Sequence, residues 1–343
     1  MRPTRRGFLA TAVGAAACAR RESQTGLKKA AQFLWAQQGE DGGWHSHTYG
    51  LLRSGQSLTP FVLDALLDVN EPAAGVGPAI EFIRRNVNDD GSLGLMDSAA
   101  PDYPNYATGL AVRAMVRAKA AGWEKMVACL RAQQFCEENG WHRDDPAYGA
   151  WGMGGGRRRP PEAGHVDLAM TRYVLEGLAA AGVCPPVPAI ERALVYLDRC
   201  QNPDGGFFFS TVNTDTNKAG EDGRRFVSYG TTTADGILAL RAAGVADSDP
   251  RIARARKWLR DHHRPDRVPG FEEGPRHLWS EGLRFYYAAA VTRAAPGLPV
   301  LLPPQHADGS FRNSVNLVKE DDPLIATAFA LRVLSRRLLK NDR

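Results

Sequence analysis

The sequence predicts an all-α protein, an α/α toroid of six helical hairpins with an inner and an outer ring of helices. Three observations predict it. A phrase made of an amphipathic helix, a glutamine, a glycine-containing turn and an aromatic residue recurs along the chain. Each copy is followed by a helix that is apolar nearly all round, which indicates burial on every side. Six such pairs can close into a ring, which needs no polar caps at its ends.

The recurring phrase is best developed in three places. In each, a glutamine ends an amphipathic helix, and a turn containing Asn-Gly or Asp-Gly-Gly leads to Trp44, Trp141 or Phe207. Glycine and asparagine accept the positive φ that ends a helix, so these turns separate the two helices of a pair. The strong copies span 34–44, 130–141 and 196–207, and weaker copies span 82–93, 258–271 and 305–311.

The two helices of each pair differ in their pattern. In the helix near residue 195, Ile190, Leu194 and Leu197 form an apolar stripe, whereas Glu191 and Asp198 face water. The second helices are rich in Ala, Leu and Gly, and we expect them at 59–68, 106–118, 167–180, 231–243, 283–293 and 323–336. No linker interrupts this pattern, which favours a single toroid domain from residue 25 to 340.

The first 18 residues have the pattern of an export signal. A charged start with Arg5-Arg6 precedes a short apolar run that ends in small residues. The arginine pair resembles the twin-arginine signal, so we expect export by that pathway and a periplasmic or membrane-anchored protein. Residues 15–18 resemble a lipobox, in which Cys18 would be acylated and anchor the protein. Simple cleavage near Ala17 or Ala19 is the alternative.

The composition excludes some partners. The net charge of +5 is concentrated in the first six residues and in 157–159, and no basic stripe is interleaved with aromatics, so we expect no nucleic-acid binding. The five cysteines include no CxxC pair. Cys129 and Cys136, seven residues apart on a helix, are about 10 Å apart and cannot bridge each other. We expect buried, free thiols.

The Gln-Gly-aromatic phrase resembles the QW repeat of squalene-hopene and oxidosqualene cyclases, and the helix alternation resembles the β subunit of protein prenyltransferases. Segments 148–152, 229–236 and 321–328 are similar to a bacterial subgroup of prenyltransferase or squalene-oxidase repeat proteins. The resemblance covers nearly all of the mature chain. It implies a toroid with a central apolar cavity, and an isoprenoid or other lipid as the ligand.

The catalytic motifs of these families are missing. Squalene-hopene cyclases use an Asp in a DxDD motif, whose nearest match here is Lys319-Glu320-Asp321-Asp322. Lys319 replaces the first Asp, and acidic residues at a helix start more commonly cap the helix. Prenyltransferases bind zinc through Asp, Cys and His near inner-helix mouths, which this sequence lacks, and His45 with His47 has no third ligand. We therefore expect no metal and no cofactor.

The starts of the inner helices carry polar residues that a toroid would bring to one mouth. His165 and Asp167 could pair as a base and its orienter, and Asp235 lies inside an apolar helix, where its burial needs compensation or a function. These three residues are the candidate catalytic residues. The candidate ligand-binding residues are Tyr106, Tyr229, Thr232, Glu281, Arg284, Tyr286 and Asp322. Alternatively, each of these residues caps a helix or bonds a neighbouring loop.

Three functions are compatible with this sequence. The first is an exported toroid that binds or transforms an isoprenoid or other lipid in its central cavity. The second is a non-catalytic scaffold at the cell envelope with a protein partner. The third is a carbohydrate-active toroid, which needs paired carboxylates across a cleft, with Asp167, Asp235 and Asp322 available.

Overall fold

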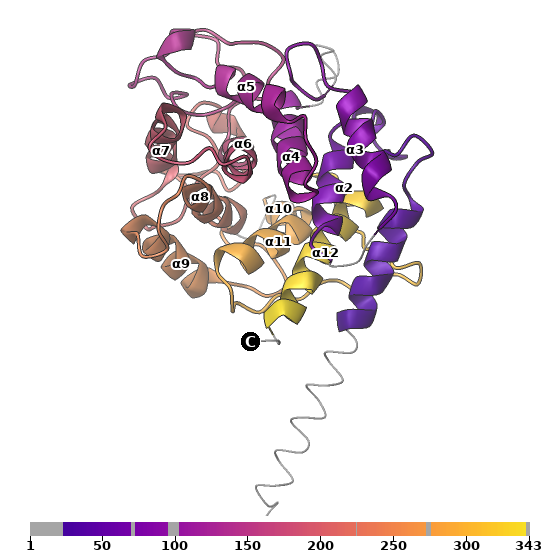
Figure 1. The fold of residues 1–343 in the computed structure, drawn as a ribbon. Coiled ribbons are helices and arrows are strands. Elements are labelled where there is room, and N and C mark those ends of the chain that lie inside the picture. Colours follow the sequence, from indigo (N-terminus) through magenta and orange to yellow (C-terminus); the bar gives the residue numbers. More distant parts are fainter. Residues whose placement is uncertain (1–22, 70–72, 95–102, 224, 272–275, 341–343) are drawn as a thin grey trace, which may run out of the picture.

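The computed structural model describes residues 23–69, 73–94, 103–223, 225–271 and 276–340, and in this part of the chain a closed ring of helices forms the centre of the fold (Figure 1). Each helix of this inner ring packs against the next one along the chain, and the last packs against the first. In order, the inner helices are α2 (Leu58–Leu66), α4 (Pro104–Arg117), α6 (Leu168–Ala180), α8 (Gly230–Ala242), α11 (Arg284–Ala294) and α12 (Pro323–Lys340). The all-α toroid is confirmed.

The outer ring consists of a helix at 23–36, α3 (Val76–Arg85), α5 (Glu124–Ala132), α7 (Pro188–Cys200) and α9 (Pro250–His262). In α7, Ile190 and Leu197 are buried while Glu191 and Asp198 are exposed, as the one-sided pattern predicts. Minor elements are the 3₁₀ helices η1 (Gly50–Leu52), η2 (Glu137–Asn139) and η3 (Thr214–Thr216), α10 (His277–Gly282), and the antiparallel pair β1 (Glu221–Asp222) and β2 (Arg225–Phe226).

The sixth pair departs from the expected pattern because its outer position holds no helix. Residues 295–304, which precede the repeat at Gln305, are irregular. This stretch contains Pro296, Pro299, Pro303 and Pro304. Proline lacks a backbone N–H and clashes with the preceding turn, so prolines at this spacing prevent a helix. An irregular segment therefore takes the place of the sixth outer helix.

The repeated glutamines join neighbouring pairs. The amide of Gln38 donates to the Gly42 carbonyl in its own turn (2.9 Å) and to the Gly75 carbonyl at the start of α3 (2.8 Å). Gln134 and Gln201 make the same two bonds in their repeats. Gln305 donates to the Gly26 carbonyl of the first outer helix at 3.0 Å. The glutamine of the last repeat thus closes the ring onto the first, and these residues are structural.

A second repeated contact fixes the aromatic of each phrase. The backbone N–H of Trp44 donates to the hydroxyl of Thr59 on the inner helix (3.0 Å), and its indole donates to the Leu34 carbonyl. Trp151 makes the equivalent bonds to Thr171 and Leu130. The aromatic of this repeat is therefore Trp151, and assigning it to Trp141 was wrong. The reason is that residues 135–148 form an insertion between the glutamine and the aromatic.

Close packing of the inner helices depends on small residues. A side chain at Gly109 of α4 would lie 2.8 Å from the Tyr173 carbonyl oxygen, and one at Gly177 of α6 would lie 2.5 Å from the Gly109 carbonyl oxygen. Only glycine permits two backbones to approach this closely. The close contact of α4 with α6 therefore depends on these two glycines.

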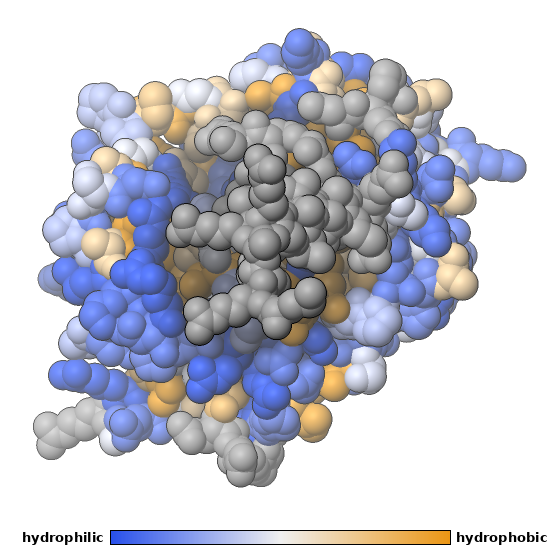
Figure 2. Space-filling model, turned by 90° about the horizontal axis from the view of Figure 1, so that it is seen from below, coloured by the Kyte–Doolittle hydropathy of each residue, from blue (hydrophilic) through white to orange (hydrophobic). Residues whose placement is uncertain are grey.

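One face of the toroid is mainly hydrophilic where its described residues are visible (Figure 2). On the face shown in Figure 2, hydrophilic residues cover most of the visible described surface, and hydrophobic residues occur in small groups between them. Among the described residues, no helix has the length and hydropathy needed to cross a membrane. Four of the cysteines are free thiols: Cys129, Cys136 and Cys200 are buried as expected, whereas Cys184 is exposed. Residues 1–18, including Cys18, lie outside the described residues.

Candidate functional site

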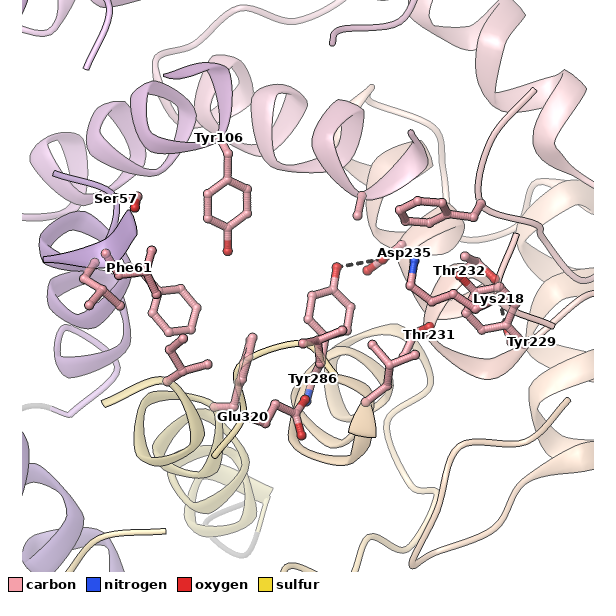
Figure 3. Close-up of a pocket in the computed structure, with 18 residues that line it drawn as sticks. Ser57, Phe61, Tyr106, Lys218, Tyr229, Thr231, Thr232, Asp235, Tyr286 and Glu320 are labelled. Carbon is pink, nitrogen blue, oxygen red and sulfur yellow. Dashed lines mark hydrogen bonds between the residues drawn. The ribbon is translucent and has the colours of Figure 1, made fainter. Parts of the chain in front are cut away.

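The inner ring encloses a chamber of about 270 Å³. Aromatic side chains from different helices define it: Phe61 from α2, Tyr106 from α4 and Tyr286 from α11 point into the same space (Figure 3). Most of the remaining lining is aliphatic or aromatic, including Leu58 and Phe329. An apolar, aromatic wall with few polar groups is typical of a small-molecule site for a hydrophobic ligand.

A wider vestibule of about 690 Å³ adjoins the chamber. The two spaces share Leu52, Tyr106, Ala169, Phe209 and Lys218, so they are continuous. The vestibule adds polar groups that the chamber lacks, and these include His165, Asp167, Asp215, Arg276 and Lys319. A ligand that occupied both spaces would meet an apolar inner end and a polar outer end.

Charged residues on the inner helices form an ion-pair network beyond the chamber. Two members of this network, Asp235 and Tyr286, also line the chamber, and the others are absent from the chamber lining. Asp64, which is fully buried, contacts Arg117 (2.5 Å) and Arg332 (2.6 Å). Every inner helix contributes at least one residue to the polar network: Asp64, Arg113, Arg117, Arg172, Glu176, Asp235, Tyr286, Arg293 and Arg332. We call this the floor network, because it closes the toroid at that level.

Glu176 is the centre of the floor network. Its carboxylate accepts from Arg113, from Arg172 at 3.2 Å and from Arg293 at 2.7 Å. The attraction of these three guanidiniums outweighs burial and holds the pKa of Glu176 well below its usual range. The same carboxylate joins α4, α6 and α11.

Asp235 belongs to the floor network and also lines the chamber. Its side chain accepts from Arg172 at 2.7 Å. It also accepts from the Tyr286 hydroxyl at 2.7 Å (Figure 3). The residue is 1% exposed, and burial raises the pKa of its carboxyl to about 6 although Arg172 and Tyr286 favour the charged form. The burial of Asp235 is therefore compensated by two partners, and one of its neighbours faces the chamber.

Lys218 lies where the chamber meets the vestibule. Its ammonium lies 3.5 Å from the centre of the Phe209 ring and 5.4 Å from that of Trp279. Burial lowers the pKa of Lys218 to about 8, against the attraction of Asp167 and Asp235. Aromatic faces stabilise a cation, so the ammonium has a defined position in the wall of the site.

Glu320 is the third titratable group in the chamber wall. Its carboxylate accepts from the backbone N–H groups of Phe285 (2.9 Å) and Tyr286 (2.8 Å) and from the Asn313 amide (2.9 Å). It therefore caps the start of α11, where acidic groups complement the helix dipole. Burial nevertheless raises the pKa of Glu320 to about 7. The capping role expected for the 319–322 segment is seen here, on α11, and at Asp322 on α12.

His165 and Asp167 form a hydrogen-bonded pair at the vestibule. The His165 Nε2 atom lies 2.8 Å from one Asp167 carboxylate oxygen, and the other oxygen accepts from the Met170 N–H and caps α6. Asp167 is thus held by the helix and in turn orients the imidazole, as a base and its orienter require. A catalytic role for either residue remains a prediction.

The other predicted residues divide into two groups. Tyr106, Tyr229, Thr232 and Tyr286 line the chamber with Asp235, although the Thr232 hydroxyl also donates to the Phe207 carbonyl. Glu281, Arg284 and Asp322 are not among the lining residues of the chamber or vestibule.

These three residues have other partners, and a ligand-binding role for them stays a prediction. Arg284 donates to the Leu301 carbonyl and lies 4.0 Å from Glu281. Asp322 accepts from the Leu324 N–H and from the Ser46 hydroxyl.

Sequence reasoning missed the floor network and Lys218. Charged residues in otherwise apolar helices, such as Asp64, Arg172 and Glu176, were a usable signal, because a buried charge requires a partner. Lys218 gave no such signal, since it lies in a loop and reaches the site only through the fold. Within the described residues, no group of three or more His, Cys, Asp or Glu side chains is placed to hold a metal ion.

Comparison with known proteins supports the fold. No protein-family model and no curated protein sequence matches the chain. Solved structures do: a type II terpene cyclase from Scytonema in complex with geranylgeranyl dihydroxybenzoate is 15% identical, with a TM-score of 0.57 over 93% of this chain and 98% of that one. A protein from Actinoplanes is 18% identical, with a TM-score of 0.56 over 92% of this chain and 99% of that one.

A third similar structure has a different activity. It is an α-1,6-mannanase variant of Salegentibacter in complex with α-1,6-mannotriose, 12% identical, with a TM-score of 0.52 over 92% of this chain and 99% of that one. Identities this low show a shared fold and no more, because one fold carries many chemistries. The function must be argued from the site.

Proposed function

We propose that this protein binds an isoprenoid or other long-chain lipid, with the chain in the chamber and the polar end in the vestibule. The observation that carries the proposal is the shape and lining of the site: an aromatic, apolar chamber that continues into a polar vestibule. Burying an apolar chain there removes it from water, which stabilises the complex by about 25 cal/mol for each Å² of apolar surface buried. The terpene cyclase that shares the fold has an isoprenoid substrate, and a relation to the QW-repeat cyclases is part of the proposal.

The chemistry available in the chamber favours binding over cyclisation. Protonating an alkene requires a strong acid, whereas burial raises the pKa of Asp235 to about 6 and that of Glu320 to about 7. Both carboxyls are also held by fixed hydrogen-bond partners. If the ligand is transformed, we place the reaction in the vestibule, where His165 oriented by Asp167 can remove a proton from the polar end.

A glycan ligand is less well supported. A sugar presents hydroxyl groups on every side, and each buried hydroxyl needs a hydrogen-bond partner. The chamber is lined mainly by Leu, Phe, Tyr and Ile side chains, and its acid Asp235 is already paired with Arg172. The vestibule could still hold a sugar.

Native mass spectrometry tests the proposal. The protein is purified from its own cell envelope and measured intact, and an organic extract is analysed for lipids. We expect one lipid per chain, and a delipidated sample should take up one geranylgeraniol. A protein that is empty and stays empty with geranylgeraniol would contradict the proposal. An empty protein that instead co-purifies with one defined envelope protein would favour a scaffold, and uptake of mannotriose would favour a glycan-binding protein.

We further propose export through the twin-arginine pathway, on the sequence of residues 1–18 alone. Replacing Arg5 and Arg6 by lysine should retain the protein in the cytoplasm. Mass spectrometry of the mature N-terminus should show an acylated Cys18; an unmodified N-terminus near residue 18 would show simple cleavage instead. Export of the double-lysine variant at the normal rate would argue against this pathway.

A further inference from the structure

Three cations line the vestibule, and none of them forms an ion pair with a carboxylate of the described residues. Lys218, Arg276 and Lys319 all contribute to its wall. None has a side-chain hydrogen bond or an ion pair with any residue in the described part of the chain. Lys218 contacts aromatic rings, and the Lys319 ammonium lies 5.7 Å from the centre of the Tyr49 ring. Arg276 packs against Gly220, where a side chain would collide with its guanidinium.

This arrangement contrasts with the rest of the molecule. The arginines of the floor network are all paired with carboxylates, as buried charges usually are. In the vestibule the available carboxylates are Asp167 and Asp215. Asp167 is already engaged by His165 and by the start of α6, and Asp215 is exposed. Among the described residues that line the vestibule, positive charge therefore exceeds negative charge, next to an apolar chamber.

Lys218 is the cation best placed to contact a ligand. It is the one of the three that lines both the chamber and the vestibule. Phe209 and Trp279 hold its stem and ammonium in position, so little side-chain freedom is lost when an anion binds. A lysine ammonium binds phosphate or carboxylate as a point charge. A partly desolvated site strengthens this attraction.

We propose that the vestibule binds the anionic head group of an amphiphile, a phosphate or a carboxylate, with Lys218 as the principal contact and Arg276 and Lys319 in support. This inference rests on the proposed function, because it assumes that the chain of the same molecule occupies the chamber. It adds the ligand class: a single-chain lipid with one charged end, rather than a neutral hydrocarbon or a sterol. Lys218 lies at the boundary where the head group and the chain of such a molecule meet.

Binding of matched probes tests the inference. Delipidated protein is titrated with geranylgeranyl phosphate, geranylgeraniol and inorganic phosphate, and binding is followed by calorimetry. Wild type should bind geranylgeranyl phosphate roughly ten- to a hundredfold more tightly than geranylgeraniol, the range of one charge-assisted contact. Lys218→Met, which keeps the length of the stem, should remove most of this preference by weakening geranylgeranyl phosphate binding far more than geranylgeraniol binding. Lys218→Arg should retain the preference.

The controls separate this inference from the proposed function. Lys125→Met, on the exposed face of α5, alters the net charge equally and should bind both probes like the wild type. Equal affinities for the two probes in wild type, or an unchanged preference in Lys218→Met, would overturn the anionic head group but leave lipid binding intact. Inorganic phosphate binding as tightly as geranylgeranyl phosphate would also overturn it. Failure of both geranylgeranyl probes to bind would instead contradict the proposed function.

Discussion

Glu176 is the position at which the floor network can be tested most sharply. Its carboxylate contacts guanidiniums from three inner helices, Arg113, Arg172 and Arg293, and its side chain is 6% exposed. Glu176→Gln keeps the shape of the side chain and removes only the charge. The three guanidiniums then have one carboxylate fewer as a partner. The new amide N–H₂ group also points at one of these guanidiniums. The variant therefore leaves buried positive charge without compensation.

The expected loss of stability is large. Removing one partner of a buried ion pair typically costs about 3–5 kcal/mol. A domain of this size loses about 2 °C of Tm per kcal/mol. We therefore expect the Tm of Glu176→Gln to fall by about 6–10 °C. Adding Arg293→Met should recover part of this loss, since it removes one of the uncompensated charges.

Thermal unfolding followed by circular dichroism at pH 7 measures this effect. The matched control is Asp261→Asn, which breaks the exposed pair of Asp261 with Lys257, and its Tm should stay at the wild-type value. A wild-type Tm for Glu176→Gln would refute the claim that the floor network stabilises the ring. A further fall of the Tm in the double variant would show that the packing of Arg293, rather than charge balance, dominates its effect on stability.

Two further predictions concern the chamber wall and the ring closure. Burial raises the pKa of Glu320 to about 7 from 4.5, so its contribution to stability is present below pH 4.5 and is lost as the pH rises to 7. Urea denaturation should accordingly show wild type losing stability relative to Glu320→Gln between pH 4.5 and 7; a pH-independent difference would contradict the raised pKa. Gln305→Ala removes two hydrogen bonds, one of which ties the last repeat to the first outer helix, and should cost about 1–3 kcal/mol. Hydrogen exchange should then quicken at 23–36 and 305–309, whereas exchange that quickens equally around the whole ring would argue against a local closure.

The fold was predictable because it depends on short-range patterns in the sequence. The buried helices lie within a few residues of their expected limits, since their apolar character on all sides is visible in the sequence. The exceptions have local causes. Prolines between 296 and 304 prevent a sixth outer helix, and an insertion between Gln134 and Trp151 hides the aromatic of its repeat. Neither alters the closure of the ring.

The site was only partly predictable because its geometry depends on the paths of the loops in the folded protein. Tyr106, Tyr286 and Asp235 could be named, since they are polar residues on inner helices. The partner of Asp235 could not be named from the sequence, because Arg172 lies 63 residues away and contacts Asp235 only through the packing of α6 on α8. Lys218 is reached by a loop with no periodic pattern. Arg284, at the first position of α11, does not line either cavity and donates to the Leu301 carbonyl, which no spacing rule predicts.

The claim that the chamber holds the lipid chain is tested most directly by filling it. Ala169 lines both the chamber and the vestibule, so Ala169→Trp places a large ring where the chain would pass. Ala246→Trp, at an exposed position between α8 and α9, is the matched control. Calorimetric titration with geranylgeraniol should give one bound molecule per chain for wild type and Ala246→Trp, and none for a folded Ala169→Trp. Equal binding by all three proteins would show that the lipid lies elsewhere and would contradict the account.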